Sequence, residues 1–247
     1  MEIYPLSEGS FTVDRSKEFL PFNKETDDLQ QRPTGSLLVE VQPFLVKTEK
    51  ELILFDSGLG FKESNSEFQI HNNIRHAGFD PEDVSLVLMS HLHKDHAGGL
   101  QFTDESGEIK LSFPGARYFI YKPELELALN GKSSSYFPSQ FSLFAQPHPQ
   151  LRLFEGESGE VAPGIYFEHT GAHSPQHVVF RTEENKIAFF GGDVAPQLQQ
   201  MKNRFVAKYD FDGKKSMQLR SAWWERGASE HWTFMFYHDI KYPSFSF

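Results

Sequence analysis

The sequence contains no cysteine among its 247 residues. Disulfide bonds, thiolate metal ligands and a cysteine nucleophile are therefore excluded. Chains without disulfides are typical of reducing compartments, so we expect a cytoplasmic protein. The N-terminal segment MEIYPLSEGSFTVD agrees with this expectation, because it lacks the basic segment and apolar run of a signal peptide.

Long apolar runs and an excess of basic residues are also lacking. No stretch approaches the ~20 apolar residues of a membrane helix, and we expect no membrane partner. Lys and Arg number 24 against 34 Asp and Glu, a net charge of −10, which argues against a nucleic-acid binder with a broad basic face. What the chain has in quantity is Phe, with 25 residues that suit a core or an apolar pocket equally.

The pattern of apolar residues predicts alternating strands and helices. Strands are expected as the pair SLLVEVQPFLVKT and ELILFD within residues 36–60, at 84–90 and 116–121, as a hairpin of 177–182 with 186–193, and at 232–239. Helices are expected at 66–79, 122–130 and 214–228. Strand pairs followed by helices, twice over, indicate an α/β fold with two β-sheets and helices outside them. No linker divides the sequence, so we expect a single domain that spans residues 1–247.

Residues 131–150 form a long connection that is rich in Ser, Pro and Phe. Long irregular loops are often lids or binding loops. This one carries four aromatic residues, Tyr136, Phe137, Phe141 and Phe144. We expect a lid that lays these rings over the functional site, with packing on the core as the alternative.

Three histidines and an aspartate occupy six positions in the segment SHLHKDHAGGL, residues 90–100. The segment follows the expected strand 84–90, at the strand end where α/β sheets usually place ligands. Neutral imidazole and carboxylate groups are ligands of zinc and similar divalent ions. His91 and His93 can reach one ion, while Asp95 and His96 project elsewhere and can hold a second. Structural zinc sites are commonly closed with cysteine, so this chain favours an open catalytic site over a closed one or a solvated His-rich loop.

Two ions need further ligands, and candidates lie at the ends of later strands. They are His173 in EHTGAHSPQH, Asp193 in FFGGDV and His238 in FYHD. His169 and His177 compete with His173, and the residues alone do not decide among the three. The glycines before Asp193 permit a close approach, and its two carboxylate oxygens can bridge two cations. The histidines expected at the surface or in loops are His71, His76 and His148.

These motifs resemble those of the metallo-β-lactamase superfamily. SHLHKDHAGG has the His-x-His-x-Asp-His form of that family. The remaining counterparts follow in order, and they are FDSG with Asp56, TGAHSPQH with His173, GGDV with Asp193 and FYHD with His238. The resemblance spans residues 36–240 and implies a four-layer αββα sandwich with a two-metal site at one edge.

The resemblance also implies how the ligands are shared. His91, His93 and His173 would hold the first metal, Asp95, His96 and His238 the second, and Asp193 with a hydroxide would bridge them. Asp56 would orient the histidine loop. The expected cofactors are two zinc ions, with Mn²⁺, Fe²⁺ or Co²⁺ as alternatives. The hydroxide would attack the substrate and Asp95 would pass a proton to the leaving alcohol, which makes Asp95 and Asp193 the expected catalytic residues.

Within the superfamily, DHAGGLQF, SFPGARYFIYKPELELAL and WTFMFYHD resemble the branch of N-acyl-homoserine lactonases and methyl parathion hydrolase. The expected substrate is a lactone, ester or phosphotriester of a partly apolar small molecule. The resemblance departs at Pro196, because the lactonases have a tyrosine three positions after the bridging aspartate. Tyr136 and Tyr209 are candidate replacements for that tyrosine.

Three other functions stay open as alternatives. They are a glyoxalase II-like thioesterase, a phosphodiesterase and a non-catalytic metal-binding protein. A phosphodiesterase would need basic residues near the pocket, and the 131–150 segment offers only Lys132. The oligomeric state is open, with a dimer as one alternative.

Overall fold

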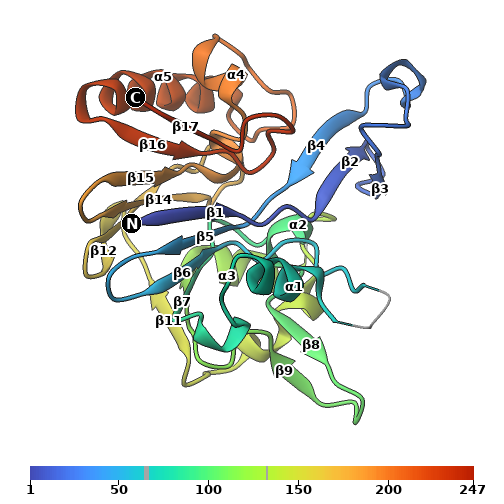
Figure 1. The fold of residues 1–247 in the computed structure, drawn as a ribbon, viewed down its shortest axis with the longest axis vertical. Helices are drawn as coiled ribbons and strands as arrows, with labels where there is room; N and C mark the ends of the chain where they lie inside the picture. The colour runs from blue at the N-terminus through green and yellow to red at the C-terminus, as the bar shows by residue number, and fades with distance from the viewer. Residues whose placement is uncertain (64–66, 132) are drawn as a thin grey trace.

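Two six-stranded β-sheets face each other in the computed structural model of the chain, with helices on both outer sides (Figure 1). The structure describes residues 1–63, 67–131 and 133–247. Ser66, at the start of the helix expected at 66–79, and Lys132 therefore lie outside the described residues. The four layers are the αββα sandwich that the motifs implied.

The first sheet has the strand order β1-β5-β6-β7-β10-β11. Its strands are β1 (Glu2–Pro5), β5 (Phe44–Lys47), β6 (Leu52–Phe55), β7 (Leu86–Leu88), β10 (Arg117–Tyr121) and β11 (Leu151–Phe154). The outer face is covered by α1 (Gln69–His76) and α3 (Lys122–Leu129), and the one-turn helix α2 (Lys94–Ala97) follows β7.

The second sheet has the order β12-β13-β14-β15-β16-β17. Its strands are β12 (Ser158–Ala162), β13 (Ile165–His169), β14 (Val178–Glu183), β15 (Ile187–Phe190), β16 (Trp232–Met235) and β17 (Ser244–Ser246). Its outer face carries α4 (Leu198–Lys202) and α5 (Gly213–Glu230).

Two small sheets extend from the sandwich. The first, β3-β2-β4, comprises β2 (Gly9–Val13), β3 (Phe19–Pro21) and β4 (Leu37–Val41), and we call it the arm, since it projects to the upper right in Figure 1. The second is the hairpin of β8 (Gln101–Thr103) and β9 (Ile109–Leu111). Short 3₁₀ turns lie at η1 (Leu29–Gln31), η2 (Pro81–Asp83), η3 (Pro138–Gln140), η4 (Ser142–Ala145) and η5 (Gly192–Val194).

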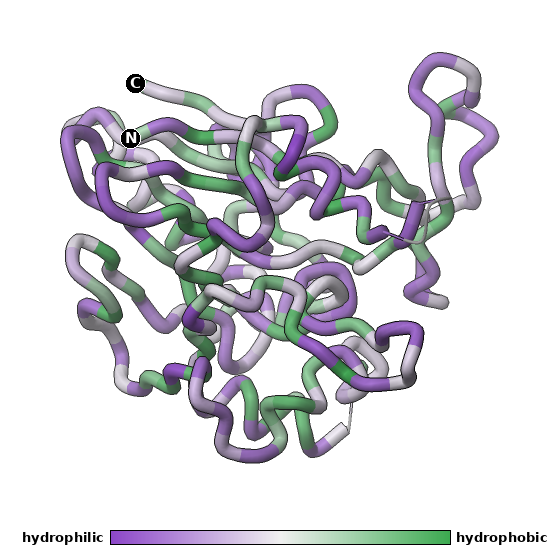
Figure 2. Tube along the Cα trace, turned by 60° about the horizontal axis from the view of Figure 1, so that its bottom comes forward, coloured by the Kyte–Doolittle hydropathy of each residue, from purple (hydrophilic) through white to green (hydrophobic). Residues whose placement is uncertain are grey.

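The period of two along each strand explains the layers. In β6, Leu52 and Leu54 pack under the helices of the first sheet, whereas Ile53 and Phe55 point between the two sheets. On the far side of the second sheet, Phe189 packs beneath α5. Strands that are buried on both faces have continuous apolar sequences, which is why the sequence predicts these strands. Figure 2 shows the hydrophobic colour along the inner segments and the hydrophilic colour at the loop tips.

The chain bends away from the expected strands at two places. The stretch 36–48 is not one strand but two, because Pro43 has no N–H to donate. β4 pairs with β2 in the arm, and β5 pairs with β1 and β6 in the first sheet. The strand expected at 232–239 ends at Met235, opposite Phe190, where its neighbour β15 ends too.

The expectation of a lid over residues 131–150 is wrong for most of the segment. Tyr136, Phe141 and Phe144 are buried and belong to the core cluster beneath the first sheet. Phe137 alone of the four aromatic residues is exposed, at 38%, and it borders the cavity described below. The alternative, core packing, holds for Phe141 and Phe144, whereas the buried ring of Tyr136 also lies 5.0 Å from that of His93, centroid to centroid.

Strand direction brings four loops to one edge of the sandwich. β6 and β7 run parallel in the first sheet, and β15 and β16 run parallel in the second. The carboxyl ends of parallel strands meet at the same edge, so the residues that follow all four strands converge there. A hydrogen bond from Val178 N to Ser90 O (2.9 Å) joins the loops of the two sheets directly. Within the described residues, no helix is long and apolar enough to cross a membrane.

Candidate metal centre

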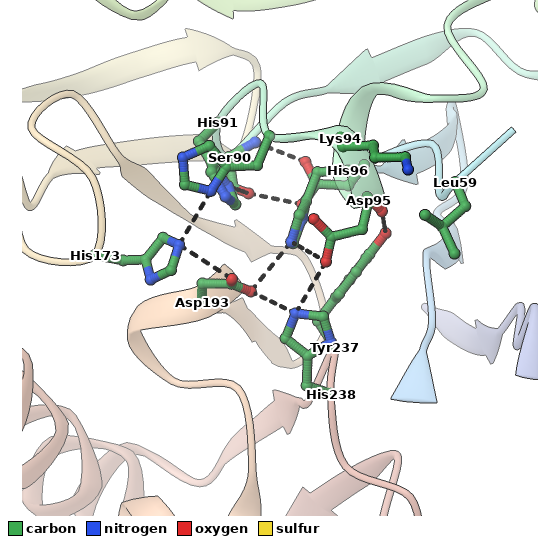
Figure 3. A network of polar contacts seen from close by, with 12 residues as sticks. Leu59, Ser90, His91, Lys94, Asp95, His96, His173, Asp193, Tyr237 and His238 are labelled. Carbon is green, nitrogen blue, oxygen red and sulfur yellow. Dashed lines mark hydrogen bonds and ion pairs between the residues drawn. The ribbon is translucent and has the colours of Figure 1, made fainter. Parts of the chain in front are cut away.

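The residues singled out in the sequence converge at this edge (Figure 3). Their side chains come from the loop after β7 and from α2, from the loop between β13 and β14, from η5 and from the segment after β16. The residues brought together are His91, His93, Asp95, His96, His173, Asp193 and His238. All except His93, which is partly exposed, are buried.

The carboxylate of Asp193 lies at the centre of the cluster. Its Oδ1 is 3.0 Å from His238 Nε2 and 3.1 Å from His96 Nε2. Its Oδ2 is 3.2 Å from Nε2 of His173. One oxygen thus faces one set of histidines and the other oxygen faces the second set, as a bridging carboxylate would.

Two groups of possible ligands lie on either side of Asp193. The ligand atoms of His91, His93 and His173 lie within 4.8 Å of one another, and so do those of Asp95, His96 and His238. A third combination, Asp56 with His91 and His96, also meets that distance. Asp56 is already engaged by hydrogen bonds, so the first two groups are the better candidates.

Hydrogen bonds fix which nitrogen of each ring is free. His238 Nδ1 lies 2.7 Å from the backbone oxygen of Glu40, which can only accept, so Nδ1 carries the proton. His173 Nδ1 lies 3.0 Å from Oδ1 of Asp210, and the same argument applies when that carboxylate is ionised. In both rings Nε2 faces Asp193, at 3.0 Å in His238 and 3.2 Å in His173, on the side where a metal ion would bind.

Asp56 organises the first histidine loop. Its Oδ1 accepts from Ser90 N (2.7 Å), and its Oδ2 accepts from Ser90 Oγ (2.6 Å). Because the Ser90 hydroxyl proton is used there, Ser90 Oγ accepts from His91 Nδ1 (3.0 Å). His96 Nδ1 lies 2.7 Å from Oδ2 of Asp56. Asp56 itself has a left-handed backbone, with φ of 55°, a strained conformation found where surrounding contacts enforce it.

The polar atoms that face inward have few partners outside the cluster. Among the described residues, His91 Nε2 is buried without a hydrogen bond, and the buried atoms His96 Nε2 and Asp193 Oδ1 have only the close contacts of the cluster itself. Buried polar atoms are nearly always satisfied, so such a group indicates an absent ligand. Imidazole nitrogens and a carboxylate that face one another in this way fit divalent cations.

The charges of the cluster act strongly on one another. Burial acts to lower the pKa of His96 and of His238, but Asp193 outweighs it and raises both, so a metal ion would displace protons from these rings. Burial, followed by the charge of His96, lowers the pKa of His91 well below its ordinary value and keeps the ring in the neutral form that binds metal. Burial acts to raise the pKa of Asp193, but His238, His96 and His173 outweigh it and hold that pKa well below its usual range. The bridging position is therefore occupied by an ionised carboxylate.

The structure distinguishes the three histidines that the sequence left open. His177 is buried with both ring nitrogens in use, since Nε2 accepts from Asp193 N (3.3 Å) and Nδ1 lies 3.1 Å from Thr170 Oγ1. His169 Nε2 faces the backbone oxygen of Pro175 at 3.2 Å and the ring stacks on Tyr121, away from Asp193. His173 is the one whose free nitrogen faces the cluster.

The remaining histidines largely follow expectation. His76 is exposed at the end of α1, and His148 lies in a loop. His71 is a correction, because it lies within α1, partly buried between the rings of Phe68 and Phe113.

Sequence reasoning missed several residues that hold the ligands in place. They are Ser90, Asp210, Glu40 and Glu124. Glu124, buried on α3, accepts from the backbone N–H of Leu92 (2.8 Å), the residue between the two histidines of the His-x-His motif. Glu124 also accepts from the hydroxyl of Tyr136 (3.3 Å). Ser90 precedes the motif directly and was the only one with a local signal.

A cavity of about 870 Å³ adjoins the cluster. Its walls come from the arm, from residues 134–137 and from residues 205–209 between α4 and α5. Pro196 and Tyr209 border the cavity, while the hydroxyl of Tyr136 is used by Glu124. Of the two candidate tyrosines, Tyr209 is the one at the cavity.

Known proteins share this sequence pattern and fold. The pattern of the Metallo-beta-lactamase superfamily matches residues 38–222. An N-acyl homoserine lactonase of Bacillus thuringiensis is 29% identical over 163 residues, 58% of this chain and 58% of that protein, so the match spans less than two thirds of the relative's length.

Two solved structures are similar over nearly the whole chain. A probable metal-dependent hydrolase from Staphylococcus aureus has a TM-score of 0.78 at 24% identity, covering 99% of this chain and 91% of that one. The dizinc quorum-quenching lactonase AidC, in complex with N-hexanoyl-L-homoserine, has a TM-score of 0.70 at 19% identity, covering 98% and 88%. At these identities the likeness shows the fold.

Proposed function

The chain belongs to the metallo-β-lactamase superfamily, and we propose that it is a single-domain hydrolase that uses two divalent metal ions, zinc in the first place, to cleave a lactone, ester or phosphotriester. The observation that carries the proposal is Asp193, whose two oxygens face two separate sets of histidines at 3.0–3.2 Å. The names of the similar proteins, a lactonase and a dizinc lactonase, support the same class of reaction.

The proposed ligands follow the two groups in the structure. His91, His93 and His173 would hold one ion, Asp95, His96 and His238 the other, with Asp193 between them. Two such ions supply a nucleophilic water of lowered pKa and polarise the bond under attack. Asp56 and Asp210 keep the Nδ1 protons of His96 and His173 in place, so that Nε2 stays free.

Proton transfer to the leaving group is the proposed role of Asp95. Its side chain borders the cavity, and its Oδ2 lies 3.5 Å from His238 Nε2. A carboxylate at the cavity wall can take a proton from the attacking water and deliver it to the leaving alkoxide, which balances the hydrolysis.

Tyr209 is the proposed replacement for the lactonase tyrosine, whose position is occupied by Pro196 in this chain. Tyr209 borders the cavity, and its hydroxyl accepts from Gln200 Nε2 (3.2 Å), which leaves the hydroxyl proton free to donate. Its ring lies 6.1 Å from that of His173, centroid to centroid. A phenol in this position can donate to the developing oxyanion.

We expect Tyr209→Phe to lower kcat by about 10- to 100-fold with a smaller change in KM, because a donor used mainly in the transition state is lost. Steady-state kinetics on one ester substrate measures both constants. Tyr242→Phe is the control, since Tyr242 is similarly exposed and does not border the cavity. A kcat equal to that of the parent protein would exclude the role of Tyr209.

A phosphodiesterase is the second candidate. The 131–150 segment offered only Lys132 as a basic residue, but Arg15, Lys17, Lys94 and Lys208 from other segments border the cavity. A thioesterase and a metal-binding protein without activity have no comparable support.

The test of the proposed function combines metal analysis with a substrate panel. Protein purified without chelator and reloaded with zinc should contain about two metal ions per chain. It should hydrolyse a lactone or an aryl ester faster than a thioester or a phosphodiester. Asp193→Ala should abolish hydrolysis. One metal equivalent or none would contradict the dinuclear site, and a faster thioester or phosphodiester reaction would replace the proposed substrate class.

A further inference from the structure

Basic residues gather around the cavity although the chain is acidic. The net charge is −10, yet Arg15, Lys17, Lys94 and Lys208 all border the cavity. The bordering acids are Asp14, Asp95 and Asp193, and the last two belong to the candidate metal centre. Outside that centre the cavity therefore has four cationic side chains and a single carboxylate. Asp14 is itself engaged by Ser16, whose N–H and hydroxyl both donate to it.

Lys17 is held toward the cavity at a cost in backbone strain. It lies in the turn between β2 and β3 of the arm and has a φ of 59°, the left-handed region that a residue with a Cβ rarely adopts. Its side chain is partly buried, and its ammonium donates to Ser135 Oγ. Strain of this kind persists where the surrounding structure enforces it, and it is concentrated at functional sites.

Lys94 reaches the same segment from the other side. Its ammonium lies 5.3 Å from the centroid of the Phe137 ring, and its backbone N–H donates to the oxygen of Ser135 (3.0 Å). Lys17 from the arm thus contacts Ser135 through its ammonium, whereas Lys94 of α2 contacts Ser135 through its backbone and places its ammonium over Phe137. Among the described residues, the lysines that form ion pairs with carboxylates are Lys24, Lys110 and Lys122, so Lys17 and Lys94 form none. A partly buried ammonium without a counter-ion is a ready site for an anion from solution.

Part of the cavity wall is apolar. Phe137, Phe205 and Val206 border the cavity and are 38–49% exposed. Exposed apolar side chains around a cavity with few polar groups are typical of a ligand pocket. An occupant that satisfies this cavity has both an apolar part and a negative charge.

We propose that the substrate is an ester or lactone that carries an additional acid group, and that Lys17 and Lys94 bind this group while the reacting carbonyl lies at the metal centre. This inference rests on the proposed hydrolase function and names its substrate class. A phosphodiester differs, because its charge lies on the reacting group itself and would be neutralised by the metal ions instead of the lysines.

Two matched esters test the proposal. Mono-(4-nitrophenyl) glutarate differs from 4-nitrophenyl pentanoate in that a carboxylate replaces the terminal methyl group. For the zinc-loaded protein we expect kcat/KM to be about tenfold higher for the charged ester, the effect of one charge-assisted hydrogen bond. Lys17→Met and Lys94→Met should each remove most of this ratio. High ionic strength should also reduce it. Lys214→Met, on the exposed face of α5, is the control and should leave the ratio unchanged.

A second measurement does not depend on turnover. Glutarate should raise the melting temperature of the zinc-loaded protein more than pentanoate does at equal concentration, and Lys17→Met should abolish the difference. Equal kcat/KM for the two esters together with equal thermal shifts would overturn the acid-group site. Faster hydrolysis of bis(4-nitrophenyl) phosphate than of either ester would overturn it in favour of a phosphodiester. Failure to hydrolyse any of these compounds would contradict the hydrolase function alone, and the thermal shifts would still decide the acid-group site.

Discussion

A histidine ring has two nitrogens, and at this site the partner of one decides what the other can bind. His173 shows the principle most clearly, since Asp210 fixes the proton on Nδ1 and leaves Nε2 to face Asp193. His177, only four residues later, has both nitrogens satisfied and is excluded from the centre. The difference between a ligand and a structural histidine lies in these outer contacts.

Asp210→Asn should therefore weaken metal binding although Asp210 is not a ligand. The amide can present its NH₂ group to Nδ1 and favour the wrong tautomer, so we expect a loss of metal affinity of about 10- to 100-fold. Competition with a chromophoric chelator measures the affinity. Glu225→Gln, an exposed change on α5, is the control. An unchanged affinity in Asp210→Asn would show that His173 keeps its orientation without this partner.

Glu8 is a second residue whose chemical state is set by its surroundings, because burial changes its pKa. It lies between β1 and β2, its Oε2 accepts from Leu59 N (2.6 Å), and it is 4% exposed. Burial raises the pKa of Glu8 from 4.5 to about 8. The folded protein therefore holds this proton more tightly than the unfolded chain, so the stability that Glu8 contributes is complete below pH 4.5 and is lost as the pH rises to about 8.

Glu8→Gln imitates the protonated acid at every pH. We expect the free energy of unfolding of the variant, relative to the parent protein, to rise steadily between about pH 5 and pH 8 and then to level off. Urea unfolding across this range, with Glu105→Gln as an exposed control, provides the measurement. A difference that stays constant with pH would mean that Glu8 is ionised throughout.

At the scale of elements, the close packing of the loop 57–60 against the end of helix α2 requires glycine at the points of contact. A Cβ at Gly60 would lie 2.2 Å from the backbone oxygen of Gly98, and Gly60 has a φ of 70°. Gly107 has a similar φ of 85° with nothing within 4 Å of a Cβ. The two positions thus share backbone strain and differ in steric clash.

We expect Gly60→Ala to destabilise the protein by clearly more than the ~1 kcal/mol that Gly107→Ala should cost. It should also lower metal affinity, because α2 carries Asp95 and His96 and has to shift to relieve the clash. Thermal unfolding and metal titration of both variants separate strain from clash. Equal destabilisation of the two would show that the loop adapts without moving α2.

At the same scale, some features of the fold and site could be predicted from the sequence and others could not. The candidate ligands were found because each stands beside a glycine or a strand end in a short motif, and local signals of that kind survive in one sequence. Asp210 was missed, since 37 residues separate it from His173 and only the fold joins them. The arm was missed as well, because its strands are short, and the break at Pro43 was read as part of one strand. The lid was misjudged because aromatic residues in an irregular segment can face the core or a cavity, and periodicity does not tell which.

At the scale of the molecule, the candidate centre joins the two sheets. His91, His93, Asp95 and His96 follow β7 of the first sheet, whereas Asp193 and His238 follow β15 and β16 of the second. Metal ions held by both sets would cross-link the sandwich at one edge. Ligands that bind the folded state alone stabilise it by an amount that grows with their concentration relative to Kd.

Removal of the metals by a chelator should therefore lower the melting temperature by about 5–10 °C, given ~2.7 kcal/mol for a ligand at 100 times its Kd and a chain of this size. Calorimetry before and after chelation, followed by zinc addition, measures the effect and its reversal. In Asp193→Ala the drop should be smaller, because the bridge is already absent. A melting temperature that survives complete metal removal would argue that the sheets need no such link.

Strand β4 contacts both the cavity and a candidate metal ligand, so it connects the two sites. Through Leu37, Leu38 and Val39 it forms a wall of the cavity, and through the backbone oxygen of Glu40 it holds the ring of His238. Any molecule that displaces this strand on entering the cavity would also shift His238 and so change the affinity for a metal ion bound there. By thermodynamic reciprocity, the metal ion would then change the affinity for that molecule by the same factor. The binding constant of the metal ion and that of the substrate would therefore each depend on whether the other is bound, and each has to be measured at a stated occupancy of the other site.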